Sequence, residues 1–270
     1  MARTADCEPV ALHVEIGGEG PTIVLLHGFG GSARNFRRDA RALRNTWRVV
    51  LADLRGHARS PAPEPAAAYR PECFEADVRA LLDRLEVERA VLGGLSFGAS
   101  VALRFALRHP ERVHALVLAA YPAARDGGGI AAIAPRFAER IDRDGLEAAG
   151  AEFVWGPRSG FDAAAAAFVK QGFLEHPPHA LAHILRESLA RERPLGEMAP
   201  ALARLEVPTL VVAGALDRVS LGPCRELAAA LPRAELVEIP DAGHVVNLAA
   251  PAAFQAALRR FLDALPPSAG

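Results

Sequence analysis

Apolar residues in this chain form short continuous runs that are separated by longer segments with helical spacing. The strongest runs are rich in Val, Leu and Ile and lie at residues 21–31, 47–57, 89–95, 112–120, 207–217 and 234–244. A continuous apolar run that is bounded by Gly, Pro or polar residues is typical of a strand buried on both faces. The alternating stretch at residues 11–18 ends in two glycines and predicts one more strand.

Helical spacing of apolar residues marks the segments between these runs. Helices are predicted at residues 33–44, 72–86, 98–109, 221–231 and 250–264. Strands that alternate with helices indicate a parallel or mostly parallel sheet with helices on both of its faces. The sequence therefore predicts the α/β fold class with a mostly parallel central sheet.

Residues 122–206 break this alternation. They contain no strong strand-like run, and their helical stretches are interrupted at Pro135, Gly145, Gly156, Pro157, Pro177, Pro178 and Pro194. Roughly 85 residues between two core strands is too long for an ordinary crossover connection. We therefore expect a core made of residues 1–121 and 207–270, with residues 122–206 inserted as a helical cap.

Charge and cysteine content exclude several classes of protein. The chain has 270 residues and a formal net charge of −1, which gives no reason to expect binding to nucleic acid or to an anionic membrane. No run reaches the ~18 apolar residues of a membrane span, and residues 1–10 lack the apolar segment of a signal peptide. Cys7, Cys73 and Cys224 are widely spaced and odd in number, so we expect no disulfide framework and a cytoplasmic location.

The stretch "GLSFG" at residues 94–98 lies between a predicted strand and a predicted helix and fits the pattern G-x-S-x-G. In such a turn the residues two positions before and after the serine meet other backbone, so Gly94 and Gly98 leave the required room. The turn would expose the Ser96 hydroxyl at a helix N-terminus, where free N–H groups favour an oxyanion. The alternative is a glycine-rich turn with a solvated serine. The order of serine, acid and histidine along the chain favours the catalytic interpretation.

With these motifs the chain resembles the α/β-hydrolase superfamily. The matching stretches are "LLHGFGGS" (25–32), "ADLRGHARS" (52–60), "GLSFGASVALRFALRHPERVHALVLAA" (94–120), "PTLVVAGALDRV" (208–219) and "IPDAGHVVN" (239–247). The resemblance implies the α/β-hydrolase fold with an inserted cap. Ala58 and Ala99 stand where relatives often have glycine. Both residues are small, so we expect local repacking only.

Three side chains are the candidates for a catalytic triad. Ser96 is the predicted nucleophile, and it needs an adjacent base because a serine hydroxyl is a poor nucleophile at neutral pH. His244 follows the last predicted strand and is the predicted base. Asp217 ends the strand "TLVVAGALD", on the loop where the superfamily usually keeps its acid, and is the predicted acid. Asp53 and Asp241 are its rivals. The resemblance implies a structural hydrogen bond for Asp53, and the position of Asp241 suggests a loop cap.

The backbone N–H groups of Phe97 and Phe29 are the predicted oxyanion hole. Phe97 directly follows the nucleophile, and Phe29 lies in the loop "HGFGG". A phosphate-binding loop is the rival interpretation. It is disfavoured because the loop lacks both the G-x-G-x-x-G pattern and a P-loop lysine. The same resemblance implies structural roles for His27 and His57.

The predicted cap carries two further candidate features. His179 and His183 have a spacing found in metal sites, and His176 is nearby, but no H-E-x-x-H pattern is present, so we expect neither a metal nor a cofactor. Trp155 and Phe173 are candidates for the substrate pocket, or they hold the cap helices together.

The resulting functional prediction is a serine hydrolase that cleaves a small or medium-sized apolar carboxylic ester, lactone or thioester through an acyl-enzyme on Ser96. The chain is similar to enol-lactonases and carboxylesterases in length and in the stretch "GLSFG". Carbon–carbon bond hydrolases, perhydrolases (cofactor-free haloperoxidases) and lyases with the same triad remain alternatives, as does a ligand-binding receptor with little turnover. Haloalkane dehalogenases and epoxide hydrolases of this fold use aspartate where Ser96 stands. The sequence indicates a small-molecule substrate and leaves the oligomeric state open.

Overall fold

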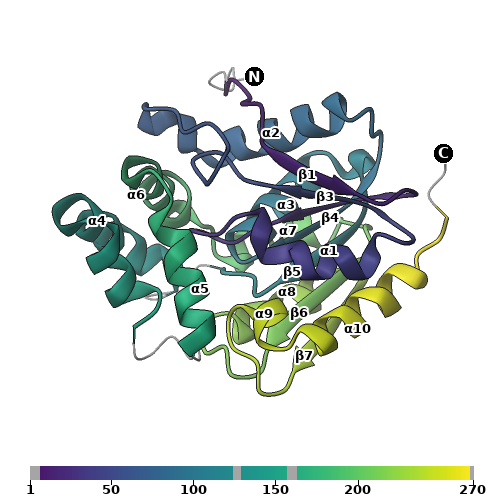
Figure 1. Cartoon of the computed structure of the whole chain (residues 1–270). Coiled ribbons are helices and arrows are strands. Elements are labelled where there is room, and N and C mark those ends of the chain that lie inside the picture. The colour runs from purple at the N-terminus through teal and green to yellow at the C-terminus, as the bar shows by residue number, and fades with distance from the viewer. Residues whose placement is uncertain (1–6, 124–128, 157–162, 268–270) are drawn as a thin grey trace.

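Seven strands form one central sheet in the order β1-β3-β2-β4-β5-β6-β7. The computed structural model describes residues 7–123, 129–156 and 163–267 (Figure 1). The strands are β1 (Val14–Gly17), β2 (Thr22–Leu26), β3 (Arg48–Ala52), β4 (Ala90–Leu95), β5 (Val113–Ala119), β6 (Thr209–Gly214) and β7 (Ala234–Ile239). Only β1 pairs in antiparallel fashion, with β3, and the other neighbouring strands are parallel. The predicted α/β class with a mostly parallel sheet is confirmed.

Burial along the strands explains their composition. Every residue of β2, β4, β5 and β6 is buried, so these strands are continuous apolar runs. The edge strands β1 and β7 are only partly buried and carry glutamates. Charged side chains on an edge discourage pairing with another sheet.

Helices cover both faces of the sheet, as the alternating pattern predicts. α2 (Pro71–Arg84), α3 (Phe97–Arg108) and α8 (Leu221–Ala230) contribute to one buried apolar cluster. The helices α1 (Arg37–Leu43) and α10 (Pro251–Asp263) contribute to the other and lie side by side (Figure 1). The remaining short elements are α9 (Val246–Ala249) and 3₁₀ turns at Ala33–Phe36, Ala66–Tyr69, Pro110–Arg112 and Leu189–Arg191.

The described residues between 122 and 206 form four α-helices: α4 (Ile130–Phe153), α5 (Ala163–Leu174), α6 (Pro178–Glu187) and α7 (Leu195–Leu202). Of these, α4, α5 and α6 gather at one end of the sheet, in teal and green at the left of Figure 1. The predicted break at Pro135 is wrong, because Pro135 lies inside α4 close to its start. Gly145 does interrupt α4, with φ 79°. Pro157 lies outside the described residues.

Cys7 and Cys73 form a disulfide bond, which corrects the prediction that the cysteines form none. The two residues are 66 positions apart, so their proximity depends on how the N-terminal segment folds back onto α2. The Val10 N–H donates to Asp77 Oδ1 over 2.7 Å and so fixes that segment against the helix. The expectation of a reducing compartment rested on the absence of a disulfide, and it loses that basis. Among the described helices, none has the length and apolar character needed to cross a bilayer.

The disulfide leads to a prediction about stability. Replacing Cys7 and Cys73 by serine should lower the free energy of unfolding by about 2–5 kcal/mol, because the cross-link restricts the unfolded chain. Thermal and denaturant unfolding of the oxidised protein and the double variant would measure this change. A reductant should lower the midpoint of the unmodified protein and leave that of the double variant unchanged. Equal sensitivity of both proteins to the reductant would contradict the assignment.

Candidate active site

Ser96 lies at the sharp turn between the end of β4 and the start of α3. Its backbone has φ 51° and ψ −114°, a region that costs a non-glycine residue about 1–3 kcal/mol. The turn is held from both sides, because the Ser96 N–H donates to Ala119 O over 2.8 Å and the Ser100 N–H donates to Ser96 O over 3.1 Å. The sheet and the helix thus fix Ser96 in a strained conformation that displays its hydroxyl at the carboxyl edge of the sheet.

Two glycines make the close contacts of this turn possible. A Cβ atom on Gly94 would collide with the backbone of Gly98, and one on Gly98 would collide with the carbonyl of Leu26 in β2. The turn therefore has no room for a side chain at either position, as the motif predicts.

The three predicted triad residues form one chain of hydrogen bonds. His244 Nε2 lies 3.0 Å from Ser96 Oγ, and His244 Nδ1 lies 2.8 Å from Asp217 Oδ2. A carboxylate only accepts hydrogen bonds, so the proton at this contact belongs to Nδ1, and Nε2 can accept from the serine hydroxyl. The arrangement brings a hydroxyl, a base and an acid into the order that proton transfer from Ser96 requires.

Asp217 is held as a carboxylate in a nearly closed environment. It is 4% exposed, and its Oδ1 accepts from the N–H groups of Val219 (3.0 Å) and Ser220 (3.1 Å). Burial by itself would raise the pKa of this carboxyl, but hydrogen bonds and charge interactions with His244 and Ser220 outweigh it, so the pKa lies below the usual value. The rival Asp241 is an exposed residue in the loop after β7, with φ 57°.

Ser220 is part of the site and was not predicted. Its hydroxyl oxygen lies 3.1 Å from His244 Nδ1, and the residue is fully buried. In the sequence, a serine just before a helix looks like an ordinary N-cap, so nothing distinguishes it from other capping residues. Its contact with His244 depends on the fold, because 24 residues separate the two.

The loop that follows β2 comes directly against the nucleophile. A Cβ on Gly28 would lie 3.5 Å from Ser96 Cβ, which places the next residue, Phe29, beside the serine. Phe97 is the first residue of α3, where backbone N–H groups have no acceptor within the helix. Both predicted oxyanion residues thus lie next to Ser96.

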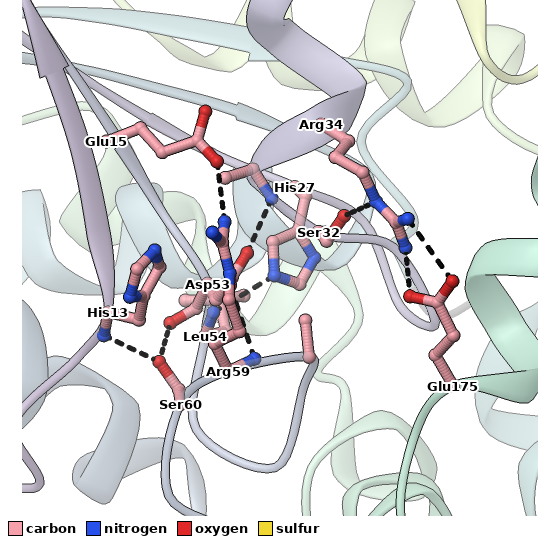
Figure 2. A network of polar contacts seen from close by, with 12 residues as sticks. His13, Glu15, His27, Ser32, Arg34, Asp53, Leu54, Arg59, Ser60 and Glu175 are labelled. Carbon is pink, nitrogen blue, oxygen red and sulfur yellow. Dashed lines mark hydrogen bonds and ion pairs between the residues drawn. The ribbon is translucent and has the colours of Figure 1, made fainter.

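Asp53 links the loop that follows β2 to the loop that follows β3 through hydrogen bonds (Figure 2). Its Oδ1 accepts from the Ala33 N–H over 2.7 Å, and its Oδ2 accepts from the Arg59 side chain and backbone over 3.3 Å. Ser60 Oγ donates to the Asp53 carbonyl over 2.5 Å and accepts from the His13 N–H over 2.9 Å. The fully buried Asp53 carboxylate is therefore occupied within these two loops, away from His244.

His27 and His57 make two further hydrogen bonds between the same loops. Burial lowers the pKa of the His27 imidazole to about 4 and holds that of His57 well below its usual value. Both rings are therefore neutral near pH 7 and can accept hydrogen bonds. His27 Nε2 accepts from the Leu54 N–H over 3.0 Å (Figure 2), and His57 Nε2 accepts from the Gly30 N–H over 3.2 Å.

The segment before α6 touches both loops. Arg34 pairs with Glu175, which follows α5 and faces Arg34 in Figure 2, and the Ala58 N–H donates to His176 Nδ1 over 2.9 Å. His179 instead approaches the Ala62 carbonyl, and His183 lies against Tyr69. Within the described parts of the chain, no three His, Cys, Asp or Glu residues are grouped so that they could hold a metal ion.

Trp155 and Phe173 belong to an aromatic cluster beside the loop that follows β2. The Phe173 ring is 5.6 Å from Trp155, 6.1 Å from Phe29 and 6.1 Å from Phe137, measured between ring centroids. Phe173 is 1% exposed and packs so closely on Gly30 that a Cβ there would collide with its ring. The Phe173 side chain thus packs in the protein interior and also contacts the loop that carries Phe29.

Comparisons with known proteins point to one family of folds. Residues 23–257 match the model of the alpha/beta hydrolase family. The protein named "Putative carbamate hydrolase RutD" of Pseudomonas syringae pv. syringae (strain B728a) is 33% identical over 92% of this chain and 96% of its own length. A thermophilic esterase of Thermogutta terrifontis superposes with a TM-score of 0.83 at 28% identity, covering 95% of this chain and 94% of its own. The enol-lactonase of Burkholderia xenovorans LB400 gives a TM-score of 0.83 at 27% identity, covering 94% and 97%.

The crowding around Gly98 can be tested by adding one methyl group. Gly98→Ala should lower the free energy of unfolding by about 1–3 kcal/mol or more, because the new Cβ would force the turn away from β2. Denaturant unfolding would measure the change. Gly196→Ala is the matched control, because a Cβ on Gly196 in α7 meets nothing within 4 Å. Equal stability of the two variants would contradict the close contact.

Proposed function

The chain belongs to the alpha/beta hydrolase family, and we propose that it is a serine hydrolase that forms an acyl-enzyme on Ser96. The observation that carries this proposal is the continuous hydrogen-bonded chain from Ser96 Oγ through His244 to the Asp217 carboxylate. The strained turn that displays Ser96 at a helix N-terminus also supports it.

The first half of the reaction follows from the geometry around Ser96. As Oγ attacks the substrate carbonyl carbon, its proton passes to His244 Nε2, and the carbonyl oxygen takes the negative charge. The backbone N–H groups of Phe29 and Phe97 would stabilise that charge. The imidazolium then gives its proton to the leaving group as the bond to the carbonyl carbon breaks, which leaves the acyl-enzyme.

Water completes the cycle with the same groups. His244 Nε2 accepts a proton from water as the water oxygen attacks the acyl carbon, and it returns a proton to Ser96 Oγ when the carboxylic acid leaves. Asp217 keeps the proton on Nδ1 and stabilises the imidazolium in both halves. These steps use neither a metal nor a cofactor.

The proposed substrates are small or medium-sized apolar carboxylic esters, lactones or thioesters. The aromatic cluster of Phe29, Phe137, Trp155 and Phe173 places apolar side chains beside the loop that would hold the oxyanion. Neighbours in structure that are named as an esterase and as an enol-lactonase act on bonds of this kind.

We also propose that residues 122–206 form a cap over the carboxyl edge of the sheet and select the substrate, while residues 1–121 and 207–270 form the core. The contacts of Phe173, Glu175 and His176 support this role, because all three meet the loops that follow β2 and β3. Ser96 lies on the same edge, and ligands of open α/β sheets bind there.

Loss of the triad residues should remove turnover. Ser96→Ala and His244→Ala should each lower kcat by on the order of 10⁶-fold, and the losses should not add. Asp217→Asn should lower kcat by on the order of 10⁴-fold, because its amide would favour the wrong imidazole tautomer. Initial rates on p-nitrophenyl esters of graded chain length, measured beside a set of lactones, would show these effects. Retention of a tenth of the activity in Ser96→Ala would exclude it as nucleophile.

A fluorophosphonate probe separates the hydrolase from a receptor with the same fold. The probe should label the unmodified protein at Ser96 and leave Ser96→Ala unlabelled. Labelling without turnover on the esters and lactones would instead favour a ligand-binding protein.

The proposed cap predicts a change in substrate preference. Trp155→Ala should alter KM or chain-length preference more than stability, because Trp155 is partly buried at the aromatic cluster. Phe173→Ala should change the substrate preference and also lower the free energy of unfolding by about 3–5 kcal/mol, because the ring is fully buried. Ile133→Ala, at an exposed position of α4, is the control. Unchanged preference in both aromatic variants would argue against the proposed cap.

A further inference from the structure

Ser220 stands at the first turn of α8, and its hydroxyl is not used for that helix. The residue occupies the N-cap position, where a serine normally accepts from a backbone N–H of the first turn, yet it makes no such bond. Its Oγ instead lies 3.1 Å from His244 Nδ1. A fully buried hydroxyl is thus directed at the histidine that we propose as the base.

The backbone of Ser220 is fixed independently of its side chain. The Ser220 N–H donates to Asp217 Oδ1 over 3.1 Å, and the Cys224 N–H donates to Ser220 O over 2.8 Å. The short turn from Asp217 to Ser220 therefore sets where the hydroxyl lies. His244 Nδ1 faces two oxygen atoms held on one short segment, Asp217 Oδ2 at 2.8 Å and Ser220 Oγ at 3.1 Å.

We infer that Ser220 is a positioning residue, which holds the imidazole of His244 in the orientation that directs Nε2 at Ser96. This inference rests on the proposed function. A single acceptor at Nδ1 fixes one direction and leaves the ring free to turn about that contact. A second acceptor beside the first shares the Nδ1–H proton and restricts this rotation. The restriction matters because the His244 side chain is 35% exposed and lies on a loop.

The hydroxyl also suits the charge changes of the reaction. Ser220 Oγ can accept from Nδ1–H while its own proton is donated to the Asp217 carboxylate. The two residues then form one acceptor group for the imidazolium, in which the serine adds no charge of its own.

Kinetics of Ser220→Ala test the inference. We expect kcat to fall about fivefold to tenfold, the value of one lost hydrogen bond, and KM to stay unchanged. Ser220→Cys fills the same space but accepts hydrogen bonds poorly, so it should resemble Ala. Full activity in the cysteine variant would mean that Ser220 only fills space, and would overturn the inference.

The same substitution in the Asp217→Ala variant tests whether Ser220 acts as an acceptor for His244 Nδ1. Asp217→Ala removes the carboxylate acceptor of His244 Nδ1, while the bonds from the Leu221 N–H to Asp217 O and from the Cys224 N–H to Ser220 O still hold the turn. Adding Ser220→Ala should lower its residual kcat further, by roughly tenfold, because Nδ1 loses its remaining acceptor. No further loss would show that Nδ1 does not use Ser220 as an acceptor, and would overturn the inference.

A spectroscopic measurement tests the contact without any substrate. In protein labelled with ¹⁵N-histidine, the Nδ1–H signal of His244, identified by its absence in His244→Ala, should exchange with water faster in Ser220→Ala. Thr209→Val is the matched control for loss of a buried hydroxyl, because the Thr209 hydroxyl donates to Val207 O, at 2.9 Å, and Thr209 begins β6 at the opposite edge of the sheet. Unchanged exchange in Ser220→Ala would overturn the inference. Substantial turnover in Ser96→Ala would overturn the proposed function alone, because this exchange does not depend on turnover.

Discussion

The close contact between the turn after β4 and the neighbouring strand is the constraint on which the site depends. Gly98 rests against the carbonyl of Leu26, and Gly94 rests against Gly98, so α3 starts directly from the sheet. Ser96 takes a strained backbone conformation as a result, and hydrogen bonds to Ala119 and Ser100 hold it there. The surrounding parallel strands supply the stability that offsets this strain, because β2, β4 and β5 are wholly buried. A strained residue persists only in such over-determined surroundings.

The polar residues at the carboxyl edge form two separate networks with different tasks. One contains Asp53 and the neutral rings of His27 and His57, and it ties the loop after β2 to the loop after β3. The other contains His244, Asp217 and Ser220 and faces Ser96. The first network fixes the backbone that would bind an oxyanion, and the second would move protons. Keeping the Asp53 carboxylate fully occupied in the first network leaves His244 with Asp217 as its carboxylate partner.

Through its described residues, the segment that we propose as a cap contacts the first network. Glu175 pairs with Arg34, and His176 accepts from the Ala58 N–H, so both contacts end on the loops that Asp53 holds. Phe173 packs on Gly30 in the same place. A shift of this segment would therefore reach Phe29 before it reached His244. Substrate selection and oxyanion binding would be coupled through these few contacts.

The sequence by itself determined the strands, the helices of the core, the mostly parallel sheet and the sharp turn at Ser96, because buried strands and sharp turns demand particular residues locally. Asp217 and His244 were selected as partners of Ser96 with the help of the resemblance to a known superfamily. The sequence by itself misjudged Pro135, which α4 accommodates near its start, and the pairing of Cys7 with Cys73, which needs the N-terminal segment to fold onto α2. Only the tertiary structure showed Ser220 beside His244, because a serine before a helix reads as a cap whichever way its hydroxyl points. Contacts between distant segments leave no local pattern, so the packing of Phe173 on Gly30 and the contact of Ser220 with His244 were decided by the fold.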